Sequence, residues 1–119
     1  YTSSTKFYYN PSTGTVNATT FNSLSDVNKK DNIETITLAL EKVSALRGVT
    51  YIWKDTKQPS LGLIAQEVEQ IFPELVSTNK EGEKSLNYGS MIGVLIEAIK
   101  EQQKIIDNQG KRINKLENL

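Results

Sequence analysis

The chain has 119 residues, an apolar fraction of 37% and a formal net charge of zero, which suit one modest domain with a lean core. The sequence contains no Cys and no His, and this excludes a Cys-His or Ser-His catalytic couple and an ordinary zinc site. The balanced charge and an apolar stretch of at most six residues, 91 to 96, argue against nucleic-acid and membrane partners, and no motif indicates a cofactor or a metal.

The first part of the chain differs in composition from the rest. Residues 1 to 25 hold a single charged residue, Lys6, and are rich in Ser, Thr and Asn, whereas every acidic residue lies from Asp26 onward. Within this part, residues 6 to 9 and 15 to 21 are typical of two strands joined by a turn. Because a lone hairpin is marginal in water, we expect partner strands from upstream sequence or from other copies of the chain.

A candidate nucleophile and a candidate base lie at the change in composition. Without Cys and His, covalent chemistry needs Ser, Thr, Lys or a carboxylate as nucleophile, and Lys, Asp, Glu or Tyr as base. A helix that begins at Asp26 would bring the amine of Lys29 or Lys30 back toward Ser25, and a Ser-Lys pair is a known form of activated serine. The alternative is an ordinary helix start, with Ser25 as N-cap and solvated lysines.

Helical periodicity follows this segment. From residue 31 the apolar side chains recur three or four apart, which predicts a helix that Gly48 ends. The apolar residues of this pattern are Ile33, Ile36, Leu40, Val43 and Leu46.

Short strands and a short helix are predicted for the middle of the chain. Residues 49 to 54 and 61 to 65 are expected to pair as strands across a polar loop, and residues 66 to 72 to form a helix stopped by Pro73. Residues 75 to 77 and 85 to 88 flank a turn at 80 to 83, which predicts another small hairpin.

Residues 89 to 119 carry a heptad repeat. Isoleucine falls at every a position and Leu or Gln at every d position over four heptads, a pattern that favours more than two strands. Arg112 and Glu117 also match a short trimer-specifying motif, whereas a single helix on its own core would hardly tolerate glutamines in the stripe. We predict a homotrimer whose interface contains Ile92, Leu95, Ile99, Gln102, Ile106, Gln109, Arg112, Ile113, Leu116 and Glu117.

The predicted fold class is therefore α+β, with small β-hairpins, short helices and a long C-terminal helix in a trimeric coiled coil. The domains expected are residues 1–25, an extended β segment, and residues 26–119, with the coiled-coil helix at 89–119.

Several motifs in order along the chain resemble one family. They are Ser25-Asp26 with Lys30, Val-Thr-Tyr-Ile-Trp at 49–53, Gly-Leu-Ile-Ala-Gln-Glu-Val at 62–68 with Pro73-Glu74, and Leu86-Asn87-Tyr88 leading into 94–100. From residue 25 to about residue 101, the chain resembles the C-terminal intramolecular chaperone domain of bacteriophage tail spikes, tail fibres and neck appendages. Endosialidase tail spikes and the myelin regulatory factor of animals have a similar domain.

The resemblance implies a function. Such a domain trimerises, helps three copies of an upstream fibre fold and associate, and is then released by self-cleavage at the Ser-Asp step. It implies Ser25 and Lys30 as the catalytic pair of an autocatalytic serine endopeptidase, cleavage at Ser25-Asp26, and residues 1–25 as the end of the client fibre. It also implies assembly in the host cytoplasm and a virion tail or appendage as the client's destination.

Alternatives stay open on two points. Attack by Ser25 on its own carbonyl would close a four-membered ring, whereas attack on the Leu24 carbonyl is an easier N-to-O acyl shift that would cut before Ser25. The resemblance favours Ser25-Asp26, through a carbonyl of a neighbouring chain or a Lys-activated water, with trimer formation enclosing Lys30 as the expected trigger. The rival functions are a non-catalytic trimerisation domain and a receptor-binding fibre tip.

Overall fold

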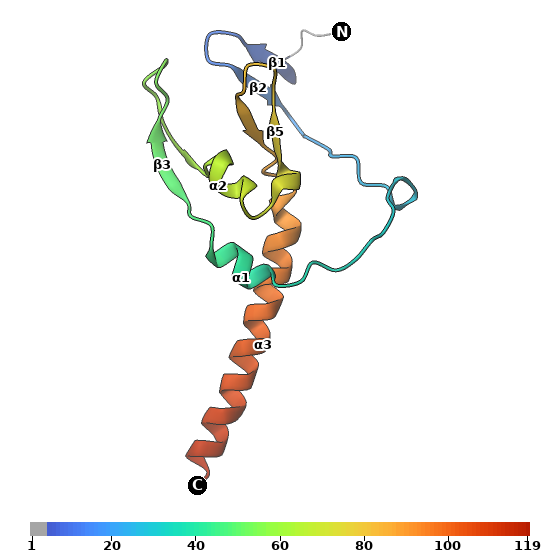
Figure 1. The fold of residues 1–119 in the computed structure, drawn as a ribbon, viewed down its shortest axis with the longest axis vertical. Helices are drawn as coiled ribbons and strands as arrows, with labels where there is room; N and C mark the ends of the chain where they lie inside the picture. Colours follow the sequence, from blue (N-terminus) through green and yellow to red (C-terminus); the bar gives the residue numbers. More distant parts are fainter. Residues whose placement is uncertain (1–4) are drawn as a thin grey trace.

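The computed structural model describes residues 5–119 and has an α+β fold, as the sequence predicts. Three separate two-stranded antiparallel sheets precede one long helix (Figure 1). The elements in chain order are β1 Phe7–Asn10, β2 Thr15–Ala18, the 3-10 turn η1 Val27–Lys29, α1 Ala39–Ser44, β3 Val49–Ile52, β4 Pro59–Gly62, α2 Ala65–Glu69, the 3-10 turn η2 Pro73–Leu75, β5 Val76–Thr78, β6 Lys84–Leu86 and α3 Met91–Glu117.

The predicted N-terminal hairpin is confirmed. β1 and β2 pair from Phe7 opposite Ala18 to Asn10 opposite Thr15. The side chain of Asn10 accepts the backbone N–H of Ser12 at 3.1 Å, and Gly14 supplies a positive φ of 71° that closes the turn. The second strand ends at Ala18, before the Phe21 that the sequence prediction included.

An extended arch of residues 19–38 connects this hairpin to α1 (Figure 1). The prediction that a helix begins at residue 31 is wrong for residues 31–38, because α1 begins only at Ala39. Two positive φ values, at Asn32 and Leu38, interrupt helical backbone there. The intervening residues are mostly β-branched, which lowers helix propensity, and their apolar side chains find little core to cover.

The two later hairpins form close to their predicted positions. β3 and β4 pair from Val49 opposite Gly62 to Ile52 opposite Pro59, so the second strand begins two residues before the predicted start. Pro59 is tolerated because it is the first residue of β4, which is an edge strand of a two-stranded sheet. β5 and β6 pair around the predicted turn, where Gly82 has a positive φ of 84°.

The hydrophobic core is small and lies between the short elements and the first half of α3. Its buried members are Ala39, Val68, Phe72, Leu75, Met91, Val94 and Ala98. The three α3 members are spaced three or four apart, so one face of the helix covers the core. Beyond Glu101 every residue of α3 is exposed, and the helix projects from the body (Figure 1).

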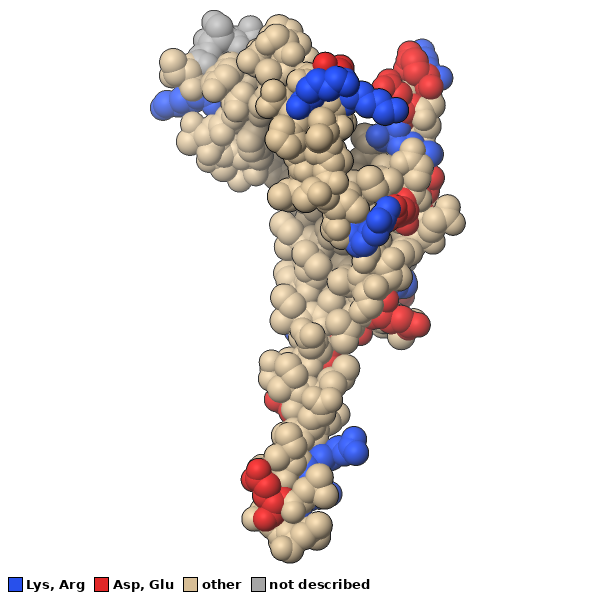
Figure 2. All heavy atoms as spheres, turned by 90° about the vertical axis from the view of Figure 1, so that its left-hand side faces the viewer, with Lys and Arg blue, Asp and Glu red and all other residues tan. Residues whose placement is uncertain are grey.

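The molecule is far from compact. Its radius of gyration is 19.9 Å, whereas a compact domain of this length has about 13.5 Å. Its accessible surface is 10532 Å², about 4,000 Å² more than expected for a compact monomer of this mass. Figure 2 shows one face whose middle region carries few charged side chains. A single chain therefore leaves much apolar surface uncovered.

Candidate active site

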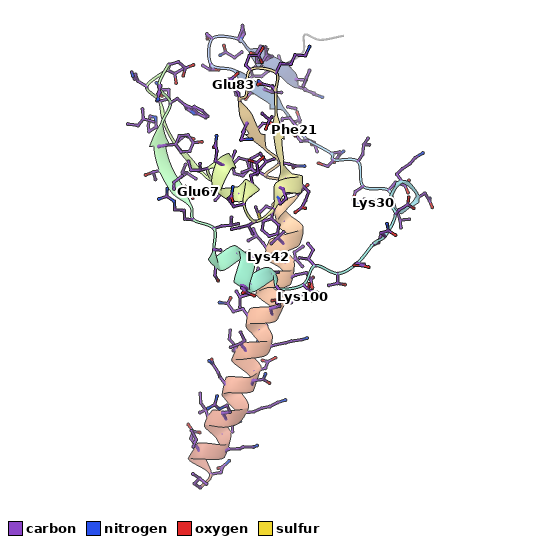
Figure 3. All side chains as sticks on the ribbon, viewed as in Figure 1. Phe21, Lys30, Lys42, Glu67, Glu83 and Lys100 are labelled. Atoms are coloured by element: carbon purple, nitrogen blue, oxygen red, sulfur yellow. The ribbon has the colours of Figure 1, made fainter. Side chains whose placement is uncertain are left out.

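The predicted catalytic residues lie on the arch, at its outer bend. The 3-10 turn η1 occupies this bend, and Figure 3 shows Lys30 standing away from the hairpins and helices. Leu24 and Val27, on either side of the Ser25-Asp26 step, are 102% and 64% exposed. The site is therefore open to solvent in the single chain.

The structure brings Ser25 and Lys30 together. The ammonium Nζ of Lys30 donates a hydrogen bond to the hydroxyl Oγ of Ser25 at 2.7 Å, across five residues of sequence. Within residues 5–119, the neighbouring Lys29 makes no such side-chain contact. Of the two lysines that spacing alone left open, Lys30 is therefore the one in contact with the serine, and its catalytic role stays a prediction.

A single turn, rather than the predicted helix, creates this contact. Asp26 is the N-cap of η1, and its carboxylate Oδ1 accepts the Asn28 N–H at 2.9 Å. The Lys29 N–H donates to the Asp26 carbonyl at 3.0 Å, and the Lys30 N–H to the Val27 carbonyl at 3.2 Å. Lys30 then returns to extended backbone, which ends the turn.

The alternative interpretation, in which Ser25 is the N-cap of an ordinary helix, is wrong about the cap, because the cap is Asp26. The sequence contains a signal for this cap, because an Asp side chain commonly accepts a hydrogen bond from the backbone N–H two residues later. A capped turn leaves the Ser25 hydroxyl free to meet an amine.

The arrangement suits proton transfer between an amine and a hydroxyl. A neutral lysine amine at this distance accepts the serine proton and leaves an alkoxide that can attack a carbonyl. The same pair could instead activate a water molecule held beside the scissile bond. Both routes need the two atoms within hydrogen-bond reach, and this condition is met.

The predicted trimer-interface residues form a continuous exposed stripe on α3. Ile92, Ile99 and Leu116 are 61%, 64% and 68% exposed. The core face of the same helix is the neighbouring one, through Met91, Val94 and Ala98. Within the single chain the a/d stripe is not used by its own core, contrary to the alternative of one amphipathic helix lying on that core. The other predicted members, all exposed or lining the same face, are Leu95, Gln102, Ile106, Gln109, Arg112, Ile113 and Glu117.

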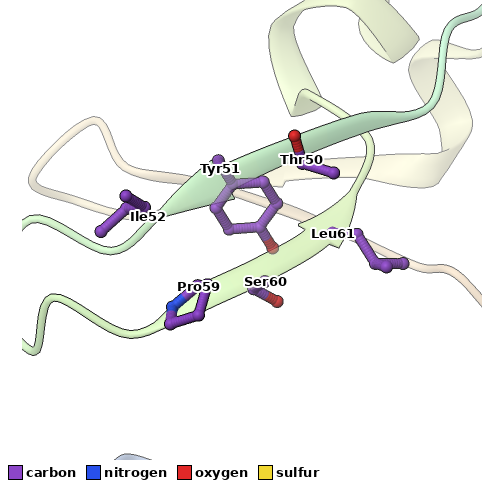
Figure 4. Close-up of a pocket in the computed structure, with 6 residues that line it drawn as sticks. All are labelled: Thr50, Tyr51, Ile52, Pro59, Ser60 and Leu61. Atoms are coloured by element: carbon purple, nitrogen blue, oxygen red, sulfur yellow. The ribbon is translucent and has the colours of Figure 1, made fainter.

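A shallow hollow without carboxylate or amine side chains lies on the β3–β4 hairpin. It is lined by Thr50, Tyr51, Ile52, Pro59, Ser60 and Leu61 (Figure 4). The hairpin extends on the side of the molecule opposite the arch (Figure 1). Its polar side-chain groups are the hydroxyls of Thr50, Tyr51 and Ser60, and neither a carboxylate nor an amine lies among its lining residues, so this hollow suits apolar contact rather than catalysis.

Across 5–119, no helix is both long enough and apolar enough to cross a bilayer. In the same span, no three acidic side chains come together as a possible cation site.

Comparisons with known proteins identify relatives of the chain. Residues 25–77 match a peptidase family described as the chaperone of endosialidase. The long tail fiber protein Gp37 of Escherichia phage AR1 is 39% identical over 87 residues, which cover 65% of this chain and 8% of that protein. Gp37 of Salmonella phage S16 is 28% identical over 117 residues, which cover 89% of this chain and 16% of that protein. The chain thus spans only a small part of the length of these relatives.

Proposed function

We propose that the chain carries a domain of the chaperone of endosialidase family, which residues 25–77 match, and that it is the self-cleaving assembly chaperone of a phage tail fibre. The observation that carries the proposal is the 2.7 Å hydrogen bond between Lys30 Nζ and Ser25 Oγ. The family match begins at this same serine. No Cys or His is present to offer another nucleophile or base.

The proposed reaction is hydrolysis of the Ser25-Asp26 peptide bond. In one route, neutral Lys30 takes a proton from a water beside the bond, and the resulting hydroxide attacks the Ser25 carbonyl. In the other, Lys30 takes the proton of the Ser25 hydroxyl, and the alkoxide attacks the Ser25 carbonyl of a neighbouring chain to form an ester that water then hydrolyses. In both routes the proton passes to the departing Asp26 amine. One water is consumed, and the products are a C-terminal carboxylate on Ser25 and a free amine on Asp26. If Ser25 attacks the Leu24 carbonyl instead, the new ends lie at residues 24 and 25, which mass spectrometry distinguishes.

The chaperone role is supported by the surface of the single chain. Its accessible area exceeds that of a compact monomer by about 4,000 Å², which is the size of a permanent interface. The exposed a/d stripe of α3, with isoleucine at every a position, fits a parallel homotrimer. Three chains joined through α3 would hold three copies of residues 1–25 and of the fibre before them at high effective concentration, which lowers the entropy cost of starting a trimeric β structure.

We further propose that the client ends in the virion tail, because the relatives are named as tail fibre proteins. Assembly would take place in the host cytoplasm, and cleavage would release residues 26–119. A fibre left without its helper persists if its unfolding barrier is high.

The test uses a longer parent chain that contains residues upstream of Tyr1. We expect the parent to appear as two fragments on a denaturing gel, and Ser25→Ala and Lys30→Met each to leave one full-length band. Two neighbours offer matched controls, Ser23→Ala and Lys29→Met, which remove the same chemical groups outside the pair. Two fragments from Ser25→Ala or from Lys30→Met would refute the proposal.

A second candidate function is receptor binding by the β3–β4 hairpin. Ile52, Trp53 and Leu61 are 64%, 54% and 76% exposed there, as on a surface that meets a partner. This candidate predicts an uncut chain that binds host cells and loses binding in Trp53→Ser. The chaperone proposal instead predicts that the fragment is released and that the finished fibre binds host cells without it.

A further inference from the structure

We propose that Asp26 is a positioning residue of the cleavage site, whose side-chain oxygen holds the turn that places Lys30 on Ser25. The inference rests on the proposed function, since positioning has meaning only if the pair is catalytic. It adds a third residue to that pair and assigns a role to its carboxylate. The role is to accept a hydrogen bond rather than to carry charge.

The contact between Ser25 and Lys30 depends on the backbone between them. Residues separated by five positions in extended chain lie about 17 Å apart, yet the two side chains meet at 2.7 Å. The reversal is made by one 3-10 turn, Val27–Lys29, capped by Asp26. A single such turn is weak when isolated, because one hydrogen bond must offset the ordering of several residues.

No other element of the described chain supports this turn. Residues 24–30 are all exposed, and every hydrogen bond recorded for residues 25–30 stays within that segment. The carboxylate of Asp26 supplies the one side-chain bond to the turn backbone, at 2.9 Å to the Asn28 N–H. The population of the turn, and with it the fraction of chains with Lys30 on Ser25, therefore depends on this cap.

The first experiment separates hydrogen-bond acceptance from charge. Asn and Ser cap helical turns about as well as Asp, whereas Ala does not. In the longer parent chain, we expect Asp26→Ala to slow cleavage about five- to tenfold, and Asp26→Asn and Asp26→Ser to restore most of the rate despite the lost charge. Equal slowing in all three variants would overturn the inference, because it would assign the effect to charge or to the scissile bond itself.

The second experiment leaves Ser25 and Asp26 unchanged. Asn28→Pro removes the N–H that Asp26 accepts, and proline also disfavours the helical conformation of Val27 before it. Val27→Pro is the matched control, because proline fits the first position of a helical turn and the Val27 N–H has no recorded partner within residues 5–119. Asn28→Pro should cleave about five- to tenfold more slowly than Val27→Pro. Equal rates for the two proline variants would contradict the inference.

A third measurement does not need cleavage at all. In a parent carrying Ser25→Ala, amide hydrogen exchange at Asn28 reports the cap directly. Adding Asp26→Ala should accelerate that exchange about five- to tenfold, and adding Asp26→Asn should not. Unchanged exchange on adding Asp26→Ala overturns the inference, even if the parent with Ser25 intact cleaves. A parent that never cleaves, with exchange that responds as expected, refutes the proposed function and leaves the turn-holding role of Asp26 supported.

Discussion

At the scale of single residues, the hydroxyl of Tyr88 holds the end of strand β4. It accepts the Leu63 N–H at 2.9 Å and donates to the Leu63 carbonyl at 3.3 Å. A methyl group added at the neighbouring Gly62 would lie 2.5 Å from that hydroxyl. The absence of a side chain at residue 62 is thus what allows the ring to reach the strand.

Substitution of this glycine should destabilise the fold. Gly62→Ala is expected to lower the free energy of unfolding by about 1–3 kcal/mol, because the added methyl displaces the Tyr88 hydroxyl from its two backbone partners. Urea denaturation measures the change. Gly48→Ala is the control, since a methyl there has nothing within 4 Å. In Tyr88→Phe the cost of Gly62→Ala should shrink, and a cost that persists undiminished would contradict the explanation.

The ion pair of Arg47 and Glu67 gives a pH prediction. The guanidinium donates from Nε and Nη2 to the two carboxylate oxygens, at 2.9 Å each. This hydrogen bonding lowers the pKa of Glu67 and raises that of Arg47. Since the folded carboxyl has the lower pKa, the pair stabilises the fold above the unfolded pKa, and this contribution is lost as pH falls through the folded value. Because both side chains are partly exposed, the contribution is small.

Removal of the partner should reverse the shift. We expect Arg47→Gln to raise the pKa of Glu67 toward its ordinary value, as followed by NMR titration of the carboxyl carbon. Lys54→Gln removes a positive charge without touching the pair and serves as control. An equal rise in both variants would assign the shift to overall charge instead of the bidentate contact.

At the scale of elements, α1 begins where a second helix caps it. The carboxylate of Glu101, on α3, accepts the N–H groups of Ala39 at 2.9 Å and Leu40 at 3.3 Å. Those donors lie at the start of α1, where no residue of its own segment offers a side-chain cap. Ile36 also reaches α3, where its Cδ1 would lie 3.7 Å from a methyl added at Gly93. The end of the arch is thereby fixed to the long helix.

Loss of this tertiary cap should weaken α1. Glu101→Ala is expected to cost about 1 kcal/mol of unfolding free energy and to speed amide exchange at Ala39 and Leu40. Glu101→Gln keeps one acceptor oxygen and should cost less. Glu97→Ala, one turn earlier on α3, removes a carboxylate that pairs with the exposed Lys100 but does not cap α1, and is the control. A loss as large for Glu97→Ala as for Glu101→Ala would contradict the capping role.

These contacts explain which elements sequence patterns could predict. The hairpins and α3 follow from local turn chemistry and a sustained heptad repeat, so the sequence predicts them to within a few residues. The start of α1 depends on Glu101, 62 residues later, and local periodicity carries no trace of that contact. Similarly, spacing placed a lysine near Ser25 but left two candidates, because the choice depends on a capped 3-10 turn rather than a regular helix.

At the scale of the whole molecule, association should depend on the exposed stripe of α3. Ile106→Gln with Ile113→Gln places polar side chains at two successive a positions and should convert a trimer into monomers, as measured by sedimentation equilibrium. Lys104→Gln with Lys111→Gln makes the same new residues on the outer face of the helix and should leave the mass unchanged. A trimeric mass in the isoleucine variant would place the interface elsewhere.

The same variant tests when cleavage occurs. If trimer formation encloses Lys30 and so favours its neutral form, the monomeric variant should cleave more slowly than the parent. The exposed position of the pair in the single chain leaves room for such enclosure. Cleavage at the parental rate by a monomer would refute this timing.

The two adjoining stripes of α3 divide its mutations into separate classes. Met91, Val94 and Ala98 serve the subunit's own interior, and Ile92, Leu95 and Ile99, one position away, are free to serve its neighbours. Truncating a side chain of the first set should lower the stability of the subunit without changing its oligomeric state. Truncating one of the second set should prevent association without lowering the stability of the subunit. Substitutions in this one helix can therefore change subunit stability and oligomeric state independently.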